Sequence, residues 1–237
     1  MSIKIAAAVL AGGQGTRMGA TMPKQFLPIA DVPILVHTLK AFLVCPSIEA
    51  VFVVTPAEWI EKTRLMLEDY YPSDARILVI PGGSSRSESL MQPIRWLKEQ
   101  GQLDEETILV SHDAVRPFVT ADIIERNITA TKKTGAAMTV VPATDTIVVS
   151  EDGASVSKVP DRRHMFQMQT PQTFYAASFA RIYESLDPQK QAAVTDASGV
   201  LLEGKVPMAL VEGRRENIKI TYPEDLDYAS WLSGHAI

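Results

Sequence analysis

Short apolar runs rich in β-branched residues recur through the first 142 residues of the chain, and stretches with a helical pattern separate them. The runs predict strands at residues 5–10, 50–55, 76–80, 107–111 and 137–142. The intervening stretches predict helices at residues 34–44, 56–71, 85–100 and 120–134. Runs that are apolar at nearly every position are typical of strands buried on both faces of a sheet. The alternation therefore predicts an α/β fold with a Rossmann-like, mostly parallel, doubly wound sheet.

This alternation ends after residue 143. Two β-like stretches at 145–150 and 155–159 flank Glu151-Asp152-Gly153-Ala154, which has the composition of a tight turn. Because an isolated hairpin is marginally stable in water, we interpret residues 144–164 as a projecting arm that packs on another subunit. An ordinary surface hairpin remains the alternative. Further strands are expected at 165–169, 208–212 and 218–221, and helices at 178–186, 196–203 and 223–232, in a single domain of residues 1–237.

Composition argues against several functional classes. The 237 residues include 23 Lys and Arg against 28 Asp and Glu, a net charge of −5, whereas dedicated nucleic-acid binders present a basic face. The apolar runs are shorter than the roughly 18 residues that a membrane span needs. Cys45 is the one cysteine, so an internal disulfide is excluded and a reducing, cytoplasmic location is expected. We expect neither nucleic acid nor membrane as a partner.

A glycine-rich segment follows the first predicted strand directly. Leu10 and Ala11 lead into Gly12, Gly13 and Gly15, whose exposed N–H groups can bind phosphate oxygens. Two cations follow, Arg17 and Lys24, and they suit a polyphosphate. The alternative is a plain glycine turn with two incidental cations.

Two familiar phosphate-binding motifs do not fit this loop. The dinucleotide fingerprint G-x-G-x-x-G fails because Met18 stands where its third glycine is needed. The second strand also lacks an acidic residue at its tip to hold a ribose, which argues against a dinucleotide-dependent oxidoreductase. A Walker loop fails because no lysine follows Gly19.

The segment LAGGQGTRMG…PKQF resembles the signature loop of sugar nucleotidyltransferases, specifically the small cytidylyltransferases that act on polyol phosphates. Further matching segments follow in the family's order: GGSSRSES at 82–89, VSHDAVRPF at 110–118, TPQ at 170–172, TDAS at 195–198, and EG…NIKIT at 212–221. The resemblance implies transfer of CMP from CTP to a polyol phosphate with release of pyrophosphate. A catalytically inactive nucleotide-binding protein is the remoter alternative.

Three cations are the candidate catalytic residues: Arg17 and Lys24 from the loop, and by resemblance Lys219. Asp113 follows a buried strand at the edge where open α/β sheets bind ligands, and its carboxylate suits Mg²⁺. A capping or turn role for Asp113 is the alternative. The resemblance assigns the following residues to the nucleotide: Leu10, Ala11, Gly12, Gly13, Gly15, Gly82, Gly83, Arg86, Ser89, Asp113, Ala114 and Arg116. From the residues alone, without the resemblance, Gly82 and Gly83 are interpreted as a plain strand-to-helix connection.

For the polyol phosphate, the resemblance assigns Arg162. The match leaves open whether Arg162 or its neighbour Arg163 contacts the substrate. It also implies three hydroxyl donors, Thr146, Thr170 and Thr195. If the arm is exchanged between subunits, Arg162 serves the partner's site and the enzyme is a homodimer. The segments at 113–118, 145–148, 167–174 and 195–198 favour ribitol 5-phosphate as acceptor, and 2-C-methyl-D-erythritol 4-phosphate is the alternative. His112 is expected to be packed or hydrogen-bonded within its strand.

Overall fold

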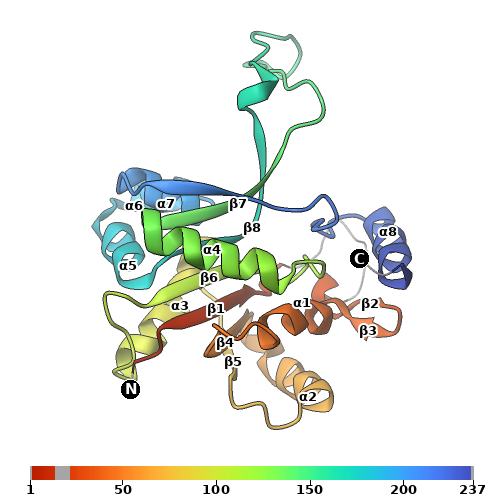
Figure 1. Ribbon diagram of the computed structural model, residues 1–237, viewed down its shortest axis with the longest axis vertical. Helices are drawn as coiled ribbons and strands as arrows, with labels where there is room; N and C mark the ends of the chain where they lie inside the picture. Colours follow the sequence, from red (N-terminus) through yellow and green to blue (C-terminus); the bar gives the residue numbers. More distant parts are fainter. Residues whose placement is uncertain (1, 14–21, 236–237) are drawn as a thin grey trace.

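The computed structural model describes residues 2–13 and 22–235, and its centre is a seven-stranded sheet in the order β5-β4-β1-β6-β8-β7-β9 (Figure 1). β8 is antiparallel to both of its neighbours, and the other described pairs of this sheet are parallel. The described strands of the sheet are β1 (Ile5–Leu10), β4 (Ala50–Thr55), β5 (Ile77–Pro81), β6 (Ile108–Asp113), β7 (Ala136–Pro142), β8 (Phe166–Tyr175) and β9 (Met208–Glu212). The predicted mostly parallel α/β sheet is confirmed.

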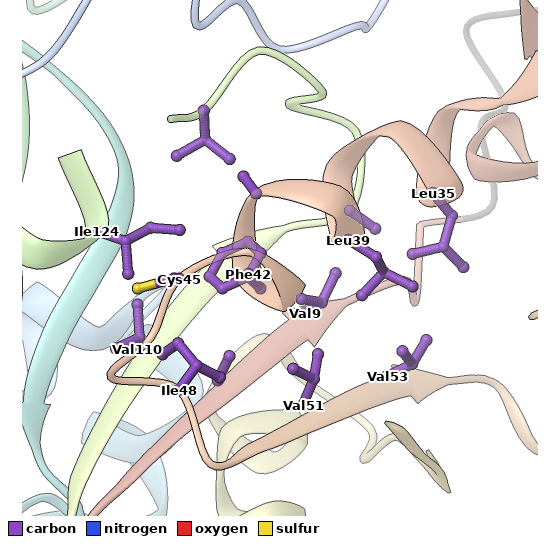
Figure 2. Packing of buried hydrophobic residues seen from close by; sticks show 14 of the residues in the cluster. Val9, Leu35, Leu39, Phe42, Cys45, Ile48, Val51, Val53, Val110 and Ile124 are labelled. Atoms are coloured by element: carbon purple, nitrogen blue, oxygen red, sulfur yellow. The ribbon is translucent and has the colours of Figure 1, made fainter. Parts of the chain in front are cut away.

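Helices cover both faces of this sheet. The described α-helices are α1 (Ile34–Leu43), α2 (Ile60–Tyr70), α3 (Arg86–Glu99), α4 (Ala121–Thr134), α5 (Ala176–Ser185), α6 (Pro188–Ala193), α7 (Ala197–Glu203) and α8 (Pro223–Gly234). Side chains that alternate along β1 and β4 enter opposite cores. One core joins them to α1, α2 and α4, and the other to α3, α5 and α7. Figure 2 shows the first core, where Leu39 and Phe42 of α1 pack over Val9, Val51 and Val53.

Small elements that the sequence pattern did not predict decorate this frame. β2 (Pro28–Ile29) and β3 (Val32–Pro33) form a two-stranded hairpin whose turn residues Ala30 and Asp31 both have positive φ. Strands of two residues are too short to show an alternating pattern. Ile29, Ile34 and Ile220 form a third cluster beside α8. The single-turn helices η2 (Lys24–Phe26), η3 (Ala57–Trp59) and η4 (Arg162–His164) complete the described structure.

Four predicted strands were wrong or incomplete. Within the arm, 145–150 and 155–159 form no ladder but meet at one bridge, Val149 with Lys158, and their side chains are almost all exposed. The predicted turn is present, with Asp152 accepting from the N–H groups of Ala154 and Ser155. Residues 218–221 are not a strand, because side-chain hydrogen bonds rather than a ladder hold this segment. The strand expected at 165–169 instead runs on to Tyr175 as β8.

The order of the strands places the candidate site. The chain moves outward from β1 to β4 and β5 on one side and to β6 on the other, so the carboxyl ends of β1 and β6 flank the crevice where such sheets bind ligands. Leu10 and Asp113, the last residues of those strands, are register partners. The arm rises from the ends of β7 and β8 and projects away from the sheet (Figure 1). Within residues 2–13 and 22–235, no helix has both the length and the apolar character to cross a membrane.

Candidate active site

A cavity of about 680 Å³ lies at the carboxyl edge of the sheet. The predicted nucleotide and catalytic residues that line it are Leu10, Ala11, Gly12, Gly13, Lys24, Gly82, Gly83, Arg86, Ser89, Asp113 and Lys219. Ala114 and Arg116 do not line it, although Arg116 forms an ion pair with Asp113. Gly15 and Arg17 lie outside the described residues. The structure thus gathers residues from distant parts of the sequence around one space.

Lys24 is buried at the floor of this cavity. Its Nζ donates a hydrogen bond to the backbone oxygen of Ile220 at 2.7 Å. The next residue, Gln25, donates from Nε2 to the oxygen of Ala11 at 2.5 Å. Phe26 packs against Trp59 with ring centroids 5.1 Å apart, and Lys62 lies over both rings. These contacts hold the Lys24 segment against β1, α2 and the segment that carries Lys219.

The second glycine turn sits against the first turn of α3. Ser85 caps this helix by accepting from the N–H of Glu88 at 3.1 Å. Ser89 accepts from the N–H of Gly83 at 3.1 Å and donates to the oxygen of Ser85 at 2.8 Å. A Cβ on Gly83 would lie 2.5 Å from Cβ of Glu88. Glycine is therefore required at position 83 by the close approach of the helix.

Asp113 is the electrostatic centre of the site. Its buried carboxylate pairs with Arg86 through Oδ1 and with Lys219 through Oδ2 at 3.0 Å, and Nε of Arg116 lies 3.5 Å from Oδ2. Burial alone would raise the pKa of Asp113, but the charges of Arg86, Lys219 and Arg116 outweigh it and hold the pKa well below its usual range. One carboxylate among Lys24, Arg86, Arg116 and Lys219 leaves an excess of positive charge that suits a polyanion.

The donor set around Asp113 decides what kind of metal site is present. Among residues 2–13 and 22–235, no group of three or more His, Cys, Asp or Glu side chains is placed to hold a metal ion. A metal cage built from protein ligands alone is therefore absent from this part of the chain. Mg²⁺ in nucleotide enzymes is commonly bound by one or two carboxylates, with substrate phosphates and water as the other ligands. Asp113 fits that pattern as a single oxygen donor.

A second cavity of about 320 Å³ adjoins the first at the base of the arm. It is lined by Arg116, Val141, Pro142, Thr144, Gln167, Met168, Gln169, Arg215, Ile218 and Lys219. Lys219 lines both cavities. The described part of the chain gives no acidic partner to Arg215, whereas the neighbouring Arg214 lies 3.5 Å from Glu216. Arg215 was not predicted from the sequence, although it lies shortly before Lys219 within a matched segment.

The predicted polyol-phosphate residues are dispersed in the single chain. Thr146 and Arg162 are exposed on the arm, where Arg162 donates to the oxygen of Thr144 at 2.7 Å. Arg163 instead pairs with Asp161 at 2.6 Å. Thr195 is exposed just before α7. Thr170 is buried in β8, where its hydroxyl contacts the backbone N–H of Asp113 and the ring of His112. The expectation that His112 is hydrogen-bonded within the fold is confirmed.

The segment that presents Lys219 depends on buried polar side chains. Asn217 donates from Nδ2 to the oxygen of Thr170 at 2.9 Å and to Oε1 of Gln169 at 3.2 Å. Arg116 donates from Nη1 to the oxygen of Asn217 at 2.8 Å. The N–H of Ile220 donates to the oxygen of Val115 at 2.9 Å. These bonds fix Lys219 next to Asp113 without a strand ladder.

An open α/β sheet whose switch point carries glycine turns and an excess of cations around one carboxylate is typical of a nucleotidyltransferase. Residues 5–233 match the family described as IspD, 2-C-methyl-D-erythritol 4-phosphate cytidylyltransferase. The chain belongs to this family of polyol-phosphate cytidylyltransferases, as the sequence resemblance predicted.

Solved structures of similar proteins agree. The 4-diphosphocytidyl-2C-methyl-D-erythritol synthase of Anaerococcus prevotii is 25% identical with a TM-score of 0.80, and the match covers 98% of this chain and 96% of that one. The 2-C-methyl-D-erythritol 4-phosphate cytidylyltransferase of Francisella tularensis is 27% identical with a TM-score of 0.79 over 96% and 99% of the two chains. The Thermus thermophilus enzyme of that name is 26% identical, with a TM-score of 0.73 over 99% and 100%. These matches favour the methylerythritol alternative over the ribitol prediction.

Proposed function

We propose that the protein transfers CMP from CTP to 2-C-methyl-D-erythritol 4-phosphate, releasing pyrophosphate, as one domain of residues 1–237. The family match supports this acceptor. The observation that carries the proposal is that Lys219 lines two adjoining cavities, a larger one with glycine turns and a smaller cationic one. A lysine shared by two anion sites stands where the acceptor phosphate meets the α-phosphate of the nucleotide.

In the proposed reaction, a phosphate oxygen of the acceptor attacks the α-phosphorus of CTP in line with the leaving group. The new phosphorus–oxygen bond forms as the bond to the bridging oxygen breaks, and pyrophosphate leaves with that electron pair. The attacking oxygen is already anionic at neutral pH, so the barrier consists mainly of charge repulsion and alignment. We assign Lys24 and the predicted Arg17 to the leaving phosphates and Lys219 to the α-phosphate.

Mg²⁺ is the proposed cofactor. Asp113 would supply one carboxylate oxygen, and the triphosphate and water would complete the coordination. When bound, the ion neutralises negative charge on the triphosphate. Arg86 and Arg116 contribute on the protein side by keeping Asp113 ionised, and Arg86, which lines the larger cavity, also places positive charge beside the nucleotide.

The smaller cavity is the proposed site of the acceptor phosphate. Arg116, Arg215 and Lys219 line it, and the amides of Gln167 and Gln169 add hydrogen-bonding groups suited to hydroxyls. Thr195 stays a predicted contact of the polyol. We expect Arg215→Ala to raise the KM for the acceptor about 10–150-fold, since a charge-assisted hydrogen bond contributes about 1.5–3 kcal/mol. Arg214→Ala is the matched control, because its guanidinium lies beside Glu216, and it should leave that KM unchanged.

The arm is proposed to act on a second copy of the chain, in a homodimer. Its exposed apolar residues Val148, Val149, Val156 and Val159 suit burial against another subunit, and Arg162 and Thr146 would reach the partner's acceptor site. Mixing the variants Arg162→Ala and Lys24→Ala tests this arrangement. Action in trans predicts recovery to about a quarter of wild-type activity, because half of randomly formed two-fold dimers carry one intact site. Recovery would be absent if each arm served its own chain.

Release of pyrophosphate from CTP and Mg²⁺ tests the function itself. We expect turnover with 2-C-methyl-D-erythritol 4-phosphate and little with ribitol 5-phosphate at equal concentration. The opposite preference would refute the proposed acceptor. Absence of release with both acceptors at high protein concentration would refute turnover and favour the inactive nucleotide-binding alternative.

A further inference from the structure

A buried histidine joins the two ends of the loop that carries the site's carboxylate. His112 is fully buried at the end of β6, where its ring packs 5.2 Å from the ring of Phe42. Its Nε2 lies 3.1 Å from the backbone oxygen of Arg116, and its Nδ1 lies 2.9 Å from Oγ1 of Thr170. The same Oγ1 lies 3.2 Å from the backbone nitrogen of Asp113. The four groups form one continuous chain of hydrogen bonds.

The direction of each hydrogen bond in this chain follows from the chemistry of its ends. A backbone oxygen accepts only, so the proton on His112 must be at Nε2 and point to Arg116. A ring proton at Nδ1 would leave the hydroxyl proton of Thr170 without an acceptor among the described residues, because Oγ1 already accepts from the N–H of Asp113, so Nδ1 is a bare acceptor. Thr170 must then donate its hydroxyl proton to Nδ1, and its oxygen accepts from the N–H of Asp113. Every donor and acceptor in the chain is satisfied in this arrangement.

This arrangement fixes both flanks of the cation cluster. Asp113, at one end, holds Arg86 and Lys219, while Arg116, at the other, contacts Asp113 and the oxygen of Asn217. The loop between them is also held where Thr38 donates to the oxygen of Ala114 at 2.8 Å. A shift of the Asp113 backbone would therefore move the carboxylate away from Lys219, on which the proposed transfer depends.

We propose that Thr170 and His112 are positioning residues that set the Asp113 carboxylate against Lys219, and that the hydroxyl proton of Thr170 is committed to His112 rather than to the substrate. The inference rests on the proposed function for its kinetic consequence but not for its hydrogen-bond pattern. In this proposal Thr170 acts by positioning Asp113, and not by the direct contact with the polyol phosphate that the sequence resemblance implied. The two roles predict different kinetics.

Thr170→Val removes the hydroxyl while nearly keeping the volume. We expect kcat to fall about tenfold or more, as for a lost buried hydrogen bond, with the KM values for CTP and acceptor within about twofold of wild type. Thr170→Ser keeps the hydroxyl and should restore most of kcat. Thr131→Val is the matched control, because Thr131 is equally buried and its hydroxyl bonds β8 at the oxygen of Thr173, away from the cavities.

His112→Gln tests the other half of the link. A glutamine amide can still donate to Arg116, but it offers no acceptor at the position of Nδ1. We expect His112→Gln to lower kcat by a factor like that of Thr170→Val, and the double variant to be no slower than either single one, since both break the same bond. Independent, multiplying effects would overturn the proposed link. A raised acceptor KM with unchanged kcat in Thr170→Val would instead favour direct contact with the substrate.

Nitrogen NMR of histidine-labelled protein at pH 7 tests the chain without any turnover. The wild-type His112 ring should show a protonated Nε2 and a bare, hydrogen-bonded Nδ1, and the Nδ1 resonance should move in Thr170→Val but not in Thr131→Val. A protonated Nδ1 in the wild type would overturn the proposal, even where a variant fails to fold. If no acceptor is turned over but the tautomer is as stated, the proposed function fails while the hydrogen-bond chain stands.

Discussion

A glycine in the nucleotide cavity can be required by packing within the protein or by close approach of the phosphates. Gly83→Ala tests the first of these requirements. An added Cβ at position 83 would lie 2.5 Å from Cβ and 2.7 Å from the carbonyl carbon of Glu88. Glu88 belongs to the first turn of α3, which Ser85 caps, so its backbone has little freedom to retreat. Overpacking of this kind costs about 1–3 kcal/mol. At about 2–4 °C per kcal/mol for a domain of this size, Tm should fall by about 2–12 °C.

Gly12→Ala is the matched control, because Gly12 lines the same cavity and no atom of the described residues lies within 4 Å of an added Cβ. We expect its Tm to equal that of wild type in a thermal melt followed by circular dichroism without nucleotide. Its KM for CTP should rise about 5–150-fold, since the methyl group would crowd the approaching phosphates at a cost of about 1–3 kcal/mol. An unchanged Tm for Gly83→Ala would refute the packing argument, and an unchanged KM for Gly12→Ala would refute close approach of the phosphates.

Three further outcomes are expected. Lys24→Ala should lower kcat about 100–1000-fold with an unchanged circular dichroism spectrum, because it removes a preorganised cation, and near-normal turnover would refute the assignment. Burial raises the pKa of Cys45 to about 12, so the native thiol should stay protonated and unreactive toward a thiol reagent at pH 8. It should react once the protein is unfolded, and fast labelling of the native protein would contradict this. Asn217→Ala should lower the free energy of unfolding by about 1–3 kcal/mol in urea titrations, because the oxygen of Thr170 loses its buried donor, and an unchanged midpoint would refute that dependence.

The parallel half of the sheet could be predicted from sequence because its strands are buried on both faces. β1 and β4 have the predicted bounds to the residue, since each is an almost wholly apolar run with Gly or Pro within two residues of its end. β8 was predicted only in part, because Thr170-Pro171-Gln172 interrupts the apolar pattern and Pro171 lacks a backbone donor. The structure places Pro171 beside a shift of register between β7 and β8, where a sheet tolerates proline.

The candidate site, like the sheet, was predicted from the sequence only in part. Residues at or next to strand ends, such as Gly12 and Asp113, were predicted together because parallel strands bring their carboxyl ends to one edge. Arg215 was not, because its role depends on which cavity the segment after β9 borders, and the local pattern contains no information on that. The arm was predicted as a projection, but its strands were not formed, since residues with exposed side chains have no face to bury in the single chain.

Residues 218–221 do not form the predicted strand, and the contacts that hold them instead explain how the site is assembled. A ladder strand would have tied Lys219 to a neighbouring strand through its own backbone, independently of the site. Instead, Asn217 and Arg116 hold this segment through side-chain bonds to β8 and to the loop after β6. Asp113 directly precedes this loop at the end of β6, so the carboxylate and Lys219 are positioned by one shared set of buried polar contacts. Breaking one of these contacts would leave a buried polar group without a partner, at a cost in free energy. A few residues therefore suffice to hold the cations around Asp113 in place.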